Sequence, residues 1–306
     1  MKTVSYISSI KAGKRYDYNN PITQALNAWP NNKITESITP VEADAGFCFG
    51  SWTPRKKETE RARLMQNLEA SDQPIFYLDS AAYSTYIRNH LQSSETYMFR
   101  IGLNSCTGTG TFWKNDMPSE RYEAFKNTFN FKEKKPQNNK DGHIVFLMQS
   151  EKGFMYDREE PFAQYCRRIV DEIREKTNRK IIFRIHPNPD SSWRSAISGV
   201  NNYGVDVADS NRMSLFESLH GAFCCVTHSS SAAVESVVEG IPTFALDDRC
   251  FGSGIYLKDI SRIENAYEDF NWEKREQWLY NLSYTSWTVD EMAQPELMEY
   301  YLSWLK

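Results

Sequence analysis

The chain has 306 residues, of which 40% are hydrophobic, 25% charged and 14% aromatic. This composition can bury a sizeable core, so wholesale disorder is excluded, and the length suits two domains of ordinary size. No run reaches the roughly 18 uncharged apolar residues that a membrane helix needs. The first residues lack the continuous apolar core of a secretory signal, so a cytoplasmic protein without a membrane span is expected. The six cysteines form no CxxC pair, and reduced, mostly buried thiols are expected.

Charge is unevenly distributed along the chain. The formal net charge is −4. Residues 1–140 contain 19 lysines and arginines against 14 acidic residues, whereas residues 141–306 contain 17 against 26. A basic first half indicates an anionic partner for that half, and ordinary fluctuation of surface charge is the alternative interpretation.

The first half alternates short apolar runs with amphipathic stretches. The apolar runs predict strands at 3–8, 45–50, 74–80 and 97–103. Helices are predicted at 21–29, at 57–70 and from Ser119 onward, and residues 104–120 are predicted to form a loop. This alternation favours a parallel sheet with helices on both faces.

The second half repeats the alternation after a polar stretch. Residues 129–142 contain four lysines, Pro136 and Gly142, and are the best candidate for an interdomain linker. Gly240 is expected at the C′ position of a helix, where a left-handed backbone is common. The predicted elements are strands at 143–149, 180–185, 223–228 and 242–247, helices at 159–177 and 230–239, and a helical tail at 272–306.

These patterns predict an α/β protein with two Rossmann-like domains. The first covers 1–135, the second covers 143–271, a cleft lies between them, and a helical tail covers 272–306. In open parallel sheets, ligands bind beyond the carboxyl ends of the strands. Residues that directly follow a strand are therefore the candidates for a functional site.

A serine triplet follows one buried strand and precedes a helix, in the stretch THSSSAAVESVVEGIP at 227–242. Ser229, Ser230 and Ser231 exceed what a helix cap requires. Because a helix N-terminus has free N–H groups and a partial positive charge, this turn suits a phosphate. A plain N-cap with spare serines is the alternative.

A histidine ends another strand, in the stretch IIFRIHPNPDS at 181–191. Pro187 holds His186 in an extended conformation, which directs its imidazole away from the strand end. An imidazole in that place can donate a hydrogen bond to a phosphate or sugar oxygen. Arg184, at the end of the same strand, is a further candidate for anion binding. A satisfied structural histidine is the alternative.

The His-Pro pair at a strand end, followed by Ser-Ser at a strand-to-helix turn, resembles bacterial sialyltransferases and capsule-type Kdo transferases. Those enzymes are glycosyltransferases of the two-Rossmann GT-B architecture, and the resemblance covers residues 143–260. It implies that His186, Pro187, Ser229 and Ser230 hold the nucleotide phosphate of a nucleotide-sugar donor, and that no metal or other cofactor is required. The overall chain is also similar to phage glycosyltransferases that modify DNA bases.

The loop MQSEKGF at 148–154 follows the first strand of the second domain. In GT-B enzymes this loop approaches the donor, so the resemblance implies donor contacts from Gln149, Ser150 and Gly153. Ordinary turn chemistry is the alternative interpretation.

A base is needed to remove the proton of an acceptor hydroxyl during glycosyl transfer. Asp79, at the end of a predicted first-domain strand, is the candidate, and its rivals are Asp44 and the turn at 8–9. A helix-capping aspartate is the alternative.

Other chemistries lack their motifs. Asp247 and Asp248 follow a strand, but turn stabilisation or contacts to a ribose or sugar are better explanations than a metal site. The five histidines show no HExxH spacing, and the chain has no P-loop and no GxSxG motif.

Three functions remain open. The first is glycosyl transfer to hydroxymethylated cytosine in double-stranded phage DNA, with a host-cytoplasmic location. The second is transfer to a capsule or lipopolysaccharide glycan, and the third is a non-catalytic nucleotide-sugar-binding module. For the DNA function, we expect basic side chains to contact the DNA phosphates and loop tryptophans to stack on a displaced base. Core packing is the alternative for each tryptophan. The candidate acceptor-binding residues are Trp52, Arg55, Lys56, Lys57 and Trp113.

Overall fold

The computed structural model divides the chain into two compact units. Unit 1 comprises Met1–Phe131 and Tyr280–Lys306, and unit 2 comprises Lys132–Leu279. The structure describes residues 2–7, 32–37, 44–49, 70, 73–87, 98–149, 160–186, 192–200, 204–209 and 212–305. The helix predicted at 21–29 lies outside these ranges, and so does the helix predicted at 57–70 apart from its last residue. The interdomain cleft stays a prediction.

Unit 2 is built on a five-stranded parallel sheet with the strand order β10-β9-β6-β7-β8. Numbered in chain order, this is a 3-2-1-4-5 arrangement. Strands are added on one side of β6 up to β8 and on its other side from β9 onward, so the strand order reverses between β6 and β9. The sheet is therefore the parallel, Rossmann-like sheet predicted for the second half. The sequence pattern missed the edge strand β8, because its exposed middle residues interrupt the apolar run. The strands are β6 (His143–Leu147), β7 (Ile181–Arg184), β8 (Val205–Ala208), β9 (Ala222–Thr227) and β10 (Thr243–Ala245).

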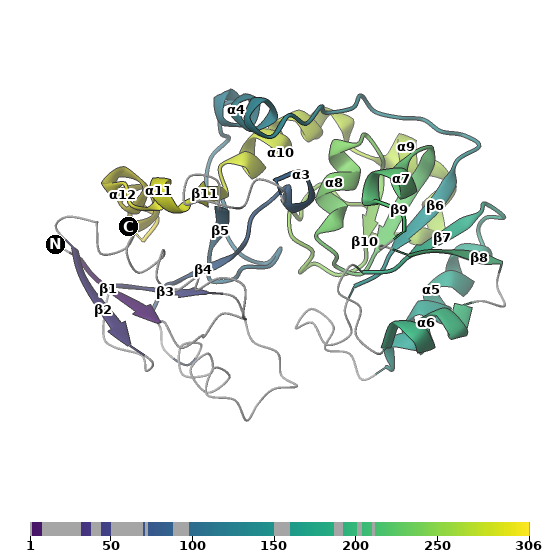
Figure 1. Ribbon diagram of the computed structural model, residues 1–306, viewed down its shortest axis with the longest axis horizontal. Helices are drawn as coiled ribbons and strands as arrows, with labels where there is room; N and C mark the ends of the chain where they lie inside the picture. The colour runs from purple at the N-terminus through teal and green to yellow at the C-terminus, as the bar shows by residue number, and fades with distance from the viewer. Residues whose placement is uncertain are drawn as a thin grey trace. The chain divides into compact units, whose positions relative to one another are not determined.

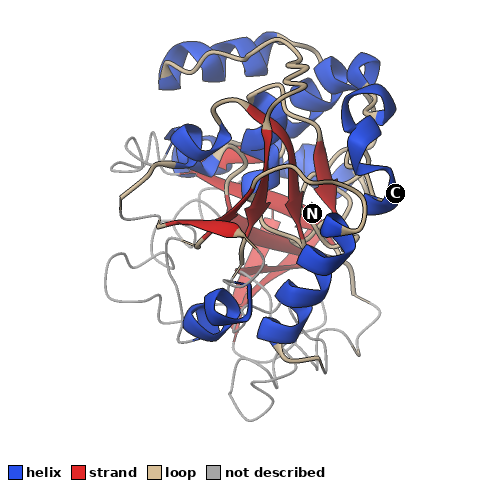
Figure 2. Ribbon diagram, turned by 90° about the vertical axis from the view of Figure 1, so that its right-hand side faces the viewer, coloured by secondary structure: helices blue, strands red, loops and turns tan. Residues whose placement is uncertain are grey.

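Helices cover both faces of this sheet (Figure 1). Alternate side chains of β6 point to opposite faces, so Ile144 and Phe146 enter one core and Val145 and Leu147 enter the other. The first core includes residues of α5, α6, η4 and α9, and the second includes residues of α7 and α8. Figure 2 draws these strands in red and the helices in blue. The elements are α5 (Phe162–Arg174), α6 (Ser192–Val200), α7 (Leu215–Leu219), α8 (Ala232–Val238), η4 (Ile260–Asn265) and α9 (Ala266–Asp269).

The polar stretch before β6 is hydrogen-bonded along unit 2. The backbone N–H of Gln137 donates to the carbonyl of Gly240 at 2.8 Å, and the Asn139 side chain donates to the carbonyl of Ala222 at 2.9 Å. The buried guanidinium of Arg275 donates to Glu133 at 2.6 Å. It also donates to the carbonyl of Lys134 in the polar stretch and to two carbonyls at the end of α8. Gly240 has a φ of +76°, as its predicted C′ position requires.

Unit 1 contains a six-stranded mixed sheet with the order β11-β5-β4-β3-β1-β2. The neighbouring strands β4, β3, β1 and β2 run parallel to one another. In contrast, β5 is antiparallel to β4, and β11 is antiparallel to β5. The parallel sheet predicted for the first half is therefore confirmed for β1, β3 and β4 and was wrong for β5. An apolar run does not encode the direction of its strand. The strands are β1 (Lys2–Ile7), β2 (Asn32–Ser37), β3 (Ala45–Phe49), β4 (Ile75–Ser80), β5 (Met98–Leu103) and β11 (Ser286–Thr288).

The C-terminal segment completes the core of unit 1. It contains a strand among its helices, so the prediction of a wholly helical tail was incomplete. Residues of α11 and α12 pack against β3, β4 and β5, with the rings of Phe76 and Tyr301 5.4 Å apart. Arg121 holds this segment in place, because its Nη1 and Nη2 donate hydrogen bonds to the two carboxylate oxygens of Glu291 at 2.6 and 2.9 Å. The remaining helices are α3 (Ser84–Ile87), α4 (Glu120–Phe129), α10 (Trp272–Ser283), α11 (Val289–Met292) and α12 (Pro295–Ser303).

The cysteines follow the sequence prediction. Those whose side chains the structure describes are free and buried, namely Cys106, Cys166, Cys224, Cys225 and Cys250. Burial raises the pKa of the Cys225 thiol to about 12, which keeps this thiol protonated and unreactive. Within the described ranges, no helix combines the length and apolar character needed to span a membrane.

Candidate functional site

The register of unit 2 brings several predicted residues to one edge of the sheet, the edge formed by the carboxyl ends of its strands. Leu147 of β6 pairs with Arg184 of β7 and with Thr227 of β9. The residues that follow these three positions therefore emerge at the same level. They include Gln149 after β6, His186 after β7 and the serine triplet after β9. This edge lies at the point where the strand order reverses, which is where open parallel sheets bind ligands.

Gln149 joins the ends of β6 and β9. Its Oε1 accepts a hydrogen bond from the backbone N–H of Ser229 at 3.0 Å and another from the Ser229 hydroxyl at 2.6 Å. Because a backbone N–H can only donate, the amide oxygen must face Ser229. The amide nitrogen, Nε2, is the buried side-chain atom without a hydrogen-bond partner among the described residues. A buried unpaired donor costs about 1–3 kcal/mol, so Gln149 is poised to receive an acceptor atom.

The serine turn differs in detail from the sequence expectation of free backbone N–H groups. The N–H of Ser229 donates to Gln149, that of Ser230 donates to the hydroxyl of Thr227 at 3.0 Å, and that of Ala232 donates to the Ser230 hydroxyl at 3.4 Å. Ser231 is the N-cap residue of α8 but makes no side-chain cap. Ser229 is buried, Ser230 half-buried and Ser231 exposed. The Ser229 hydroxyl is therefore turned toward Gln149, and Ser230 and Ser231 are the serines of this turn that solvent reaches.

The end of β7 carries the other predicted pair. His186 is half-buried and lies two residues beyond the end of β7, at the same edge as the serine turn. Arg184 is buried, and its Nη1 donates to the carbonyls of Met213 and Ser214 at 3.0 Å each. Burial lowers the pKa of Arg184, and the nearby Glu217 partly offsets this effect. In this structure Arg184 thus fastens β7 to the start of α7.

A chain of buried polar groups behind the serine turn was missed by the sequence analysis. The hydroxyl of Tyr165 lies 3.1 Å from Nδ1 of His228, whose Nε2 lies 3.4 Å from Oδ2 of Asp247. Arg249 donates to both carboxylate oxygens of Asp247 at 2.8 Å. His228 directly follows β9 and Asp247 lies just beyond β10, so position after a strand was the available signal.

The environment of Asp247 favours its charged form. Partial burial by itself raises the pKa of this carboxyl, but the hydrogen bonds from Arg249 and the proximity of His228 lower it to about 2. A fixed negative charge therefore stands beside the imidazole of His228, which is 1% exposed. This arrangement orients the imidazole and braces the turn that carries the serines.

In unit 1, the predicted base lies at the end of β4. Oδ2 of Asp79 accepts a hydrogen bond from Nη2 of Arg100 at 2.8 Å, and Oδ1 accepts from the backbone N–H of Ser80 at 2.7 Å. The Asp79 side chain is 23% exposed. Each carboxylate oxygen can accept a further hydrogen bond. The rival Asp44 is exposed and lies directly before β3.

Several predicted residues lie outside the described part of the chain. Trp113 is described and is half-buried on the loop after β5. In the described ranges, no group of three or more histidine, cysteine or acidic side chains is arranged to hold a metal ion. The predicted residues outside these ranges are Trp52, Arg55, Lys56, Lys57, Ser150, Gly153 and Pro187.

No protein-family model matches the chain. No curated protein sequence matches it either. Among solved structures, it is similar to the beta-Kdo 2,7 transferase KpsC of Thermosulfurimonas dismutans, with 11% identity, a TM-score of 0.47, and coverage of 87% of this chain and 89% of that one. It is also similar to MnaA of S. aureus in a co-structure with UDP, with 11% identity, a TM-score of 0.34, and coverage of 99% and 97%. Likenesses at this level assign no function.

The charge on Asp247 is expected to stabilise the fold. The folded-state pKa of about 2 lies below the ordinary 3.8, so the stabilisation is present above about pH 4 and is lost as the pH falls toward 2. Asp247→Asn should lower the free energy of unfolding at pH 6 by about 1–2 kcal/mol. Urea unfolding at several pH values measures this difference, which should shrink below pH 4.

The neighbouring Asp248→Asn is the matched control. The side chain of Asp248 is 88% exposed and contacts Lys258 at 3.0 Å, so its replacement should change stability by less than about 0.5 kcal/mol. Equal effects of the two substitutions at pH 6 would contradict a stabilising role for the Asp247 charge.

Proposed function

We propose that this chain is a glycosyltransferase that binds a nucleotide-sugar donor at the β6–β9 edge of unit 2. The observation that carries the proposal is the buried Nε2 of Gln149, which has no hydrogen-bond partner among the described residues and lies where the strand order of a parallel sheet reverses. A phosphate oxygen is a strong acceptor for such a donor. The donor's diphosphate or phosphate would satisfy Gln149 and become the leaving group.

The neighbouring side chains suit the same ligand. Adjacent strands lie about 5 Å apart, so β7 and β9, on either side of β6, are separated by about 10 Å. A phosphate placed over β6 would lie between the imidazole of His186 and the hydroxyls of Ser230 and Ser231. Imidazole and hydroxyl groups donate hydrogen bonds to phosphate oxygens, and these bonds would strengthen as charge develops on the leaving group.

Asp79 is the proposed base for the acceptor hydroxyl. The hydrogen bond from Arg100 holds the carboxylate in place. Its partial exposure leaves room for an incoming hydroxyl. Glycosyl transfer by this route forms the new glycosidic bond as the bond to the phosphate breaks, and the hydroxyl proton passes to the carboxylate.

DNA containing hydroxymethylated cytosine is the proposed acceptor. The support is the excess of positive charge in residues 1–140 and the exposed lysines at positions 132, 135 and 140. Lys134 is also exposed, but its ammonium pairs with Glu239 at 2.5 Å. Contacts between such cations and phosphates release counterions, which makes DNA binding dependent on salt.

Gln149→Glu tests the donor site. This change keeps an oxygen for Ser229 but places a carboxylate oxygen where the amide nitrogen stands, so it should repel a phosphate. Calorimetry with nucleoside diphosphates and monophosphates should show affinity at least about tenfold below wild type. His186→Ala should also weaken binding.

Gln164→Glu makes the same chemical change at an exposed position of α5 and should leave nucleotide affinity unchanged. If Gln149→Glu binds nucleotides as tightly as wild type, the phosphate does not lie against Gln149 and the donor site must be placed elsewhere.

Asp79→Asn tests the base. The amide can still accept the hydrogen bond from Arg100 but cannot take a proton, so transfer should fall by about 10²–10⁴-fold while donor affinity stays unchanged. Asp44→Asn is the control and should retain activity; the reverse result would move the base to Asp44. Wild-type protein should also hydrolyse its donor slowly without acceptor, and complete absence of hydrolysis would favour a non-catalytic binding module.

Salt dependence tests the acceptor. Mass spectrometry of hydroxymethylcytosine DNA incubated with a panel of nucleotide sugars should detect a glycosylated base. The yield should fall steeply with added salt, because several phosphate contacts are lost together. A flat salt profile, or failure of the protein to bind DNA at all, would replace DNA with a glycan acceptor.

A further inference from the structure

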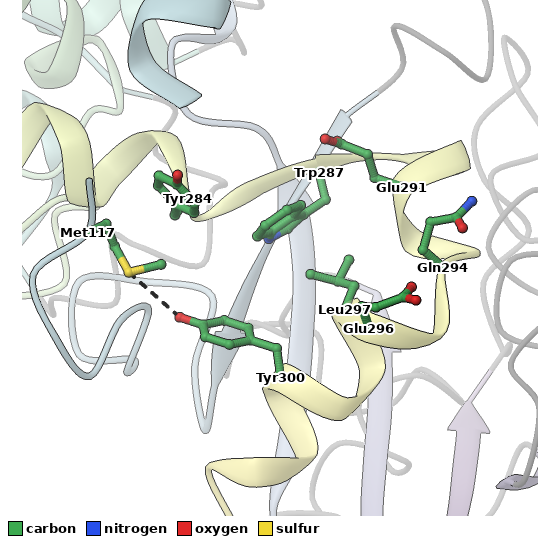
Figure 3. Close-up of a pocket in the computed structure, with 8 residues that line it drawn as sticks. All are labelled: Met117, Tyr284, Trp287, Glu291, Gln294, Glu296, Leu297 and Tyr300. Carbon is green, nitrogen blue, oxygen red and sulfur yellow. Dashed lines mark hydrogen bonds between the residues drawn. The ribbon is translucent and has the colours of Figure 1, made fainter. Parts of the chain in front are cut away.

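Unit 1 contains a pocket, formed within the C-terminal segment and the loop that precedes α4. Its volume is about 400 Å³, which lies in the range of small-molecule sites. Figure 3 shows the side chains that line it, which come from the loop, β11, α11, α12 and the turn before β11. They are Met117, Tyr284, Trp287, Glu291, Gln294, Glu296, Leu297 and Tyr300.

The walls of this pocket are mainly aromatic and apolar. Tyr284, Trp287 and Tyr300 contribute three rings, and Leu297 and Met117 contribute aliphatic and thioether surface. The rings are held in place: Nε1 of Trp287 donates to the hydroxyl of Tyr301 at 2.8 Å, and the Tyr300 hydroxyl lies 4.0 Å from the sulfur of Met117 (Figure 3). Burial raises the pKa of Tyr300, so its hydroxyl is neutral. The pocket is thus a preorganised apolar site with electron-rich ring faces.

The charge around these walls is negative. Residues 284–305 contain four acidic residues and no lysine, arginine or histidine. Two described cations contact this segment. The guanidinium of Arg121 stacks 4.1 Å from the centroid of Trp287 and is neutralised by its two hydrogen bonds to Glu291, and the ammonium of Lys114 donates to the carbonyl of Trp304 at 2.7 Å. Glu296 is exposed and has no ion pair or hydrogen bond with any described residue. Glu296 therefore supplies an uncompensated carboxylate at an aromatic pocket.

We propose that this pocket binds a small organic ammonium ion. Ring faces attract a cation through their quadrupoles, and aromatic pockets are the recurrent way in which proteins recognise alkylammonium groups. The apolar walls accommodate the carbon substituents, while Glu296 provides the opposite charge. An anionic ligand would meet like charge, and a free sugar would find few polar partners on these walls. This site does not depend on the donor site in unit 2.

Choline and its uncharged isostere 3,3-dimethylbutan-1-ol separate charge from shape. The full chain is titrated by calorimetry with choline, with the neutral isostere, and with tetramethylammonium and benzyltrimethylammonium. Sodium chloride keeps the ionic strength the same in all titrations. Choline should bind about tenfold more tightly than the neutral isostere, since cation–π and carboxylate attraction act on the charged ligand alone. Equal affinities, or no binding of any ammonium ion, would overturn the proposal.

Glu296→Gln and Glu299→Gln form a matched pair on α12. Both side chains are exposed, but Glu299 does not line the pocket, and neither change disturbs the core. Glu296→Gln should weaken choline binding about threefold or more while leaving the neutral isostere unaffected. Glu299→Gln should leave both affinities unchanged. Identical choline affinity in the two variants and wild type would remove Glu296, and with it the proposed charge recognition.

Discussion

The hydrogen bonds between Gln149 and Ser229 are the interaction on which the account of unit 2 depends. They exist because β6 lies next to β9, although the two strands are 80 residues apart at the bonded positions. That adjacency is the reversal point of the 3-2-1-4-5 order, and it places two loop starts at one level of the sheet. The orientation of the Gln149 amide follows from this pairing, and so does the position of its Nε2, which has no hydrogen-bond partner in the described part of the chain.

Buried elements of unit 2 were predictable because their sequences carry a clear signal. The uninterrupted apolar run of β6 and the single apolar stripe of α5 specify one type of element each, and Gly240 marks the end of α8. Edge strands are different: the middle residues of β8 are exposed, so its sequence does not read as an apolar run. The sequence of β2, NKITES, likewise contains no apolar run. Strand direction in unit 1 was likewise unreadable, because a buried strand has the same pattern in either orientation.

The candidate site was predictable to the same extent. His186 and the serine triplet follow strands, and that position is visible in the sequence. The network of Tyr165, His228 and Asp247 was not, because its members come from three elements whose contacts appear only when the sheet is assembled. The same holds for the aromatic pocket of unit 1, where the C-terminal segment supplies most of the walls and Arg121 fixes its place.

A crystal structure of the chain with the nucleotide that binds it most tightly would test the central claim most directly. A phosphate oxygen should lie within hydrogen-bonding distance of the Gln149 amide nitrogen, beside the hydroxyl of Ser230 and the imidazole of His186. Nucleotide density at any other place, with the Gln149 amide nitrogen still unpaired at saturating ligand, would contradict it.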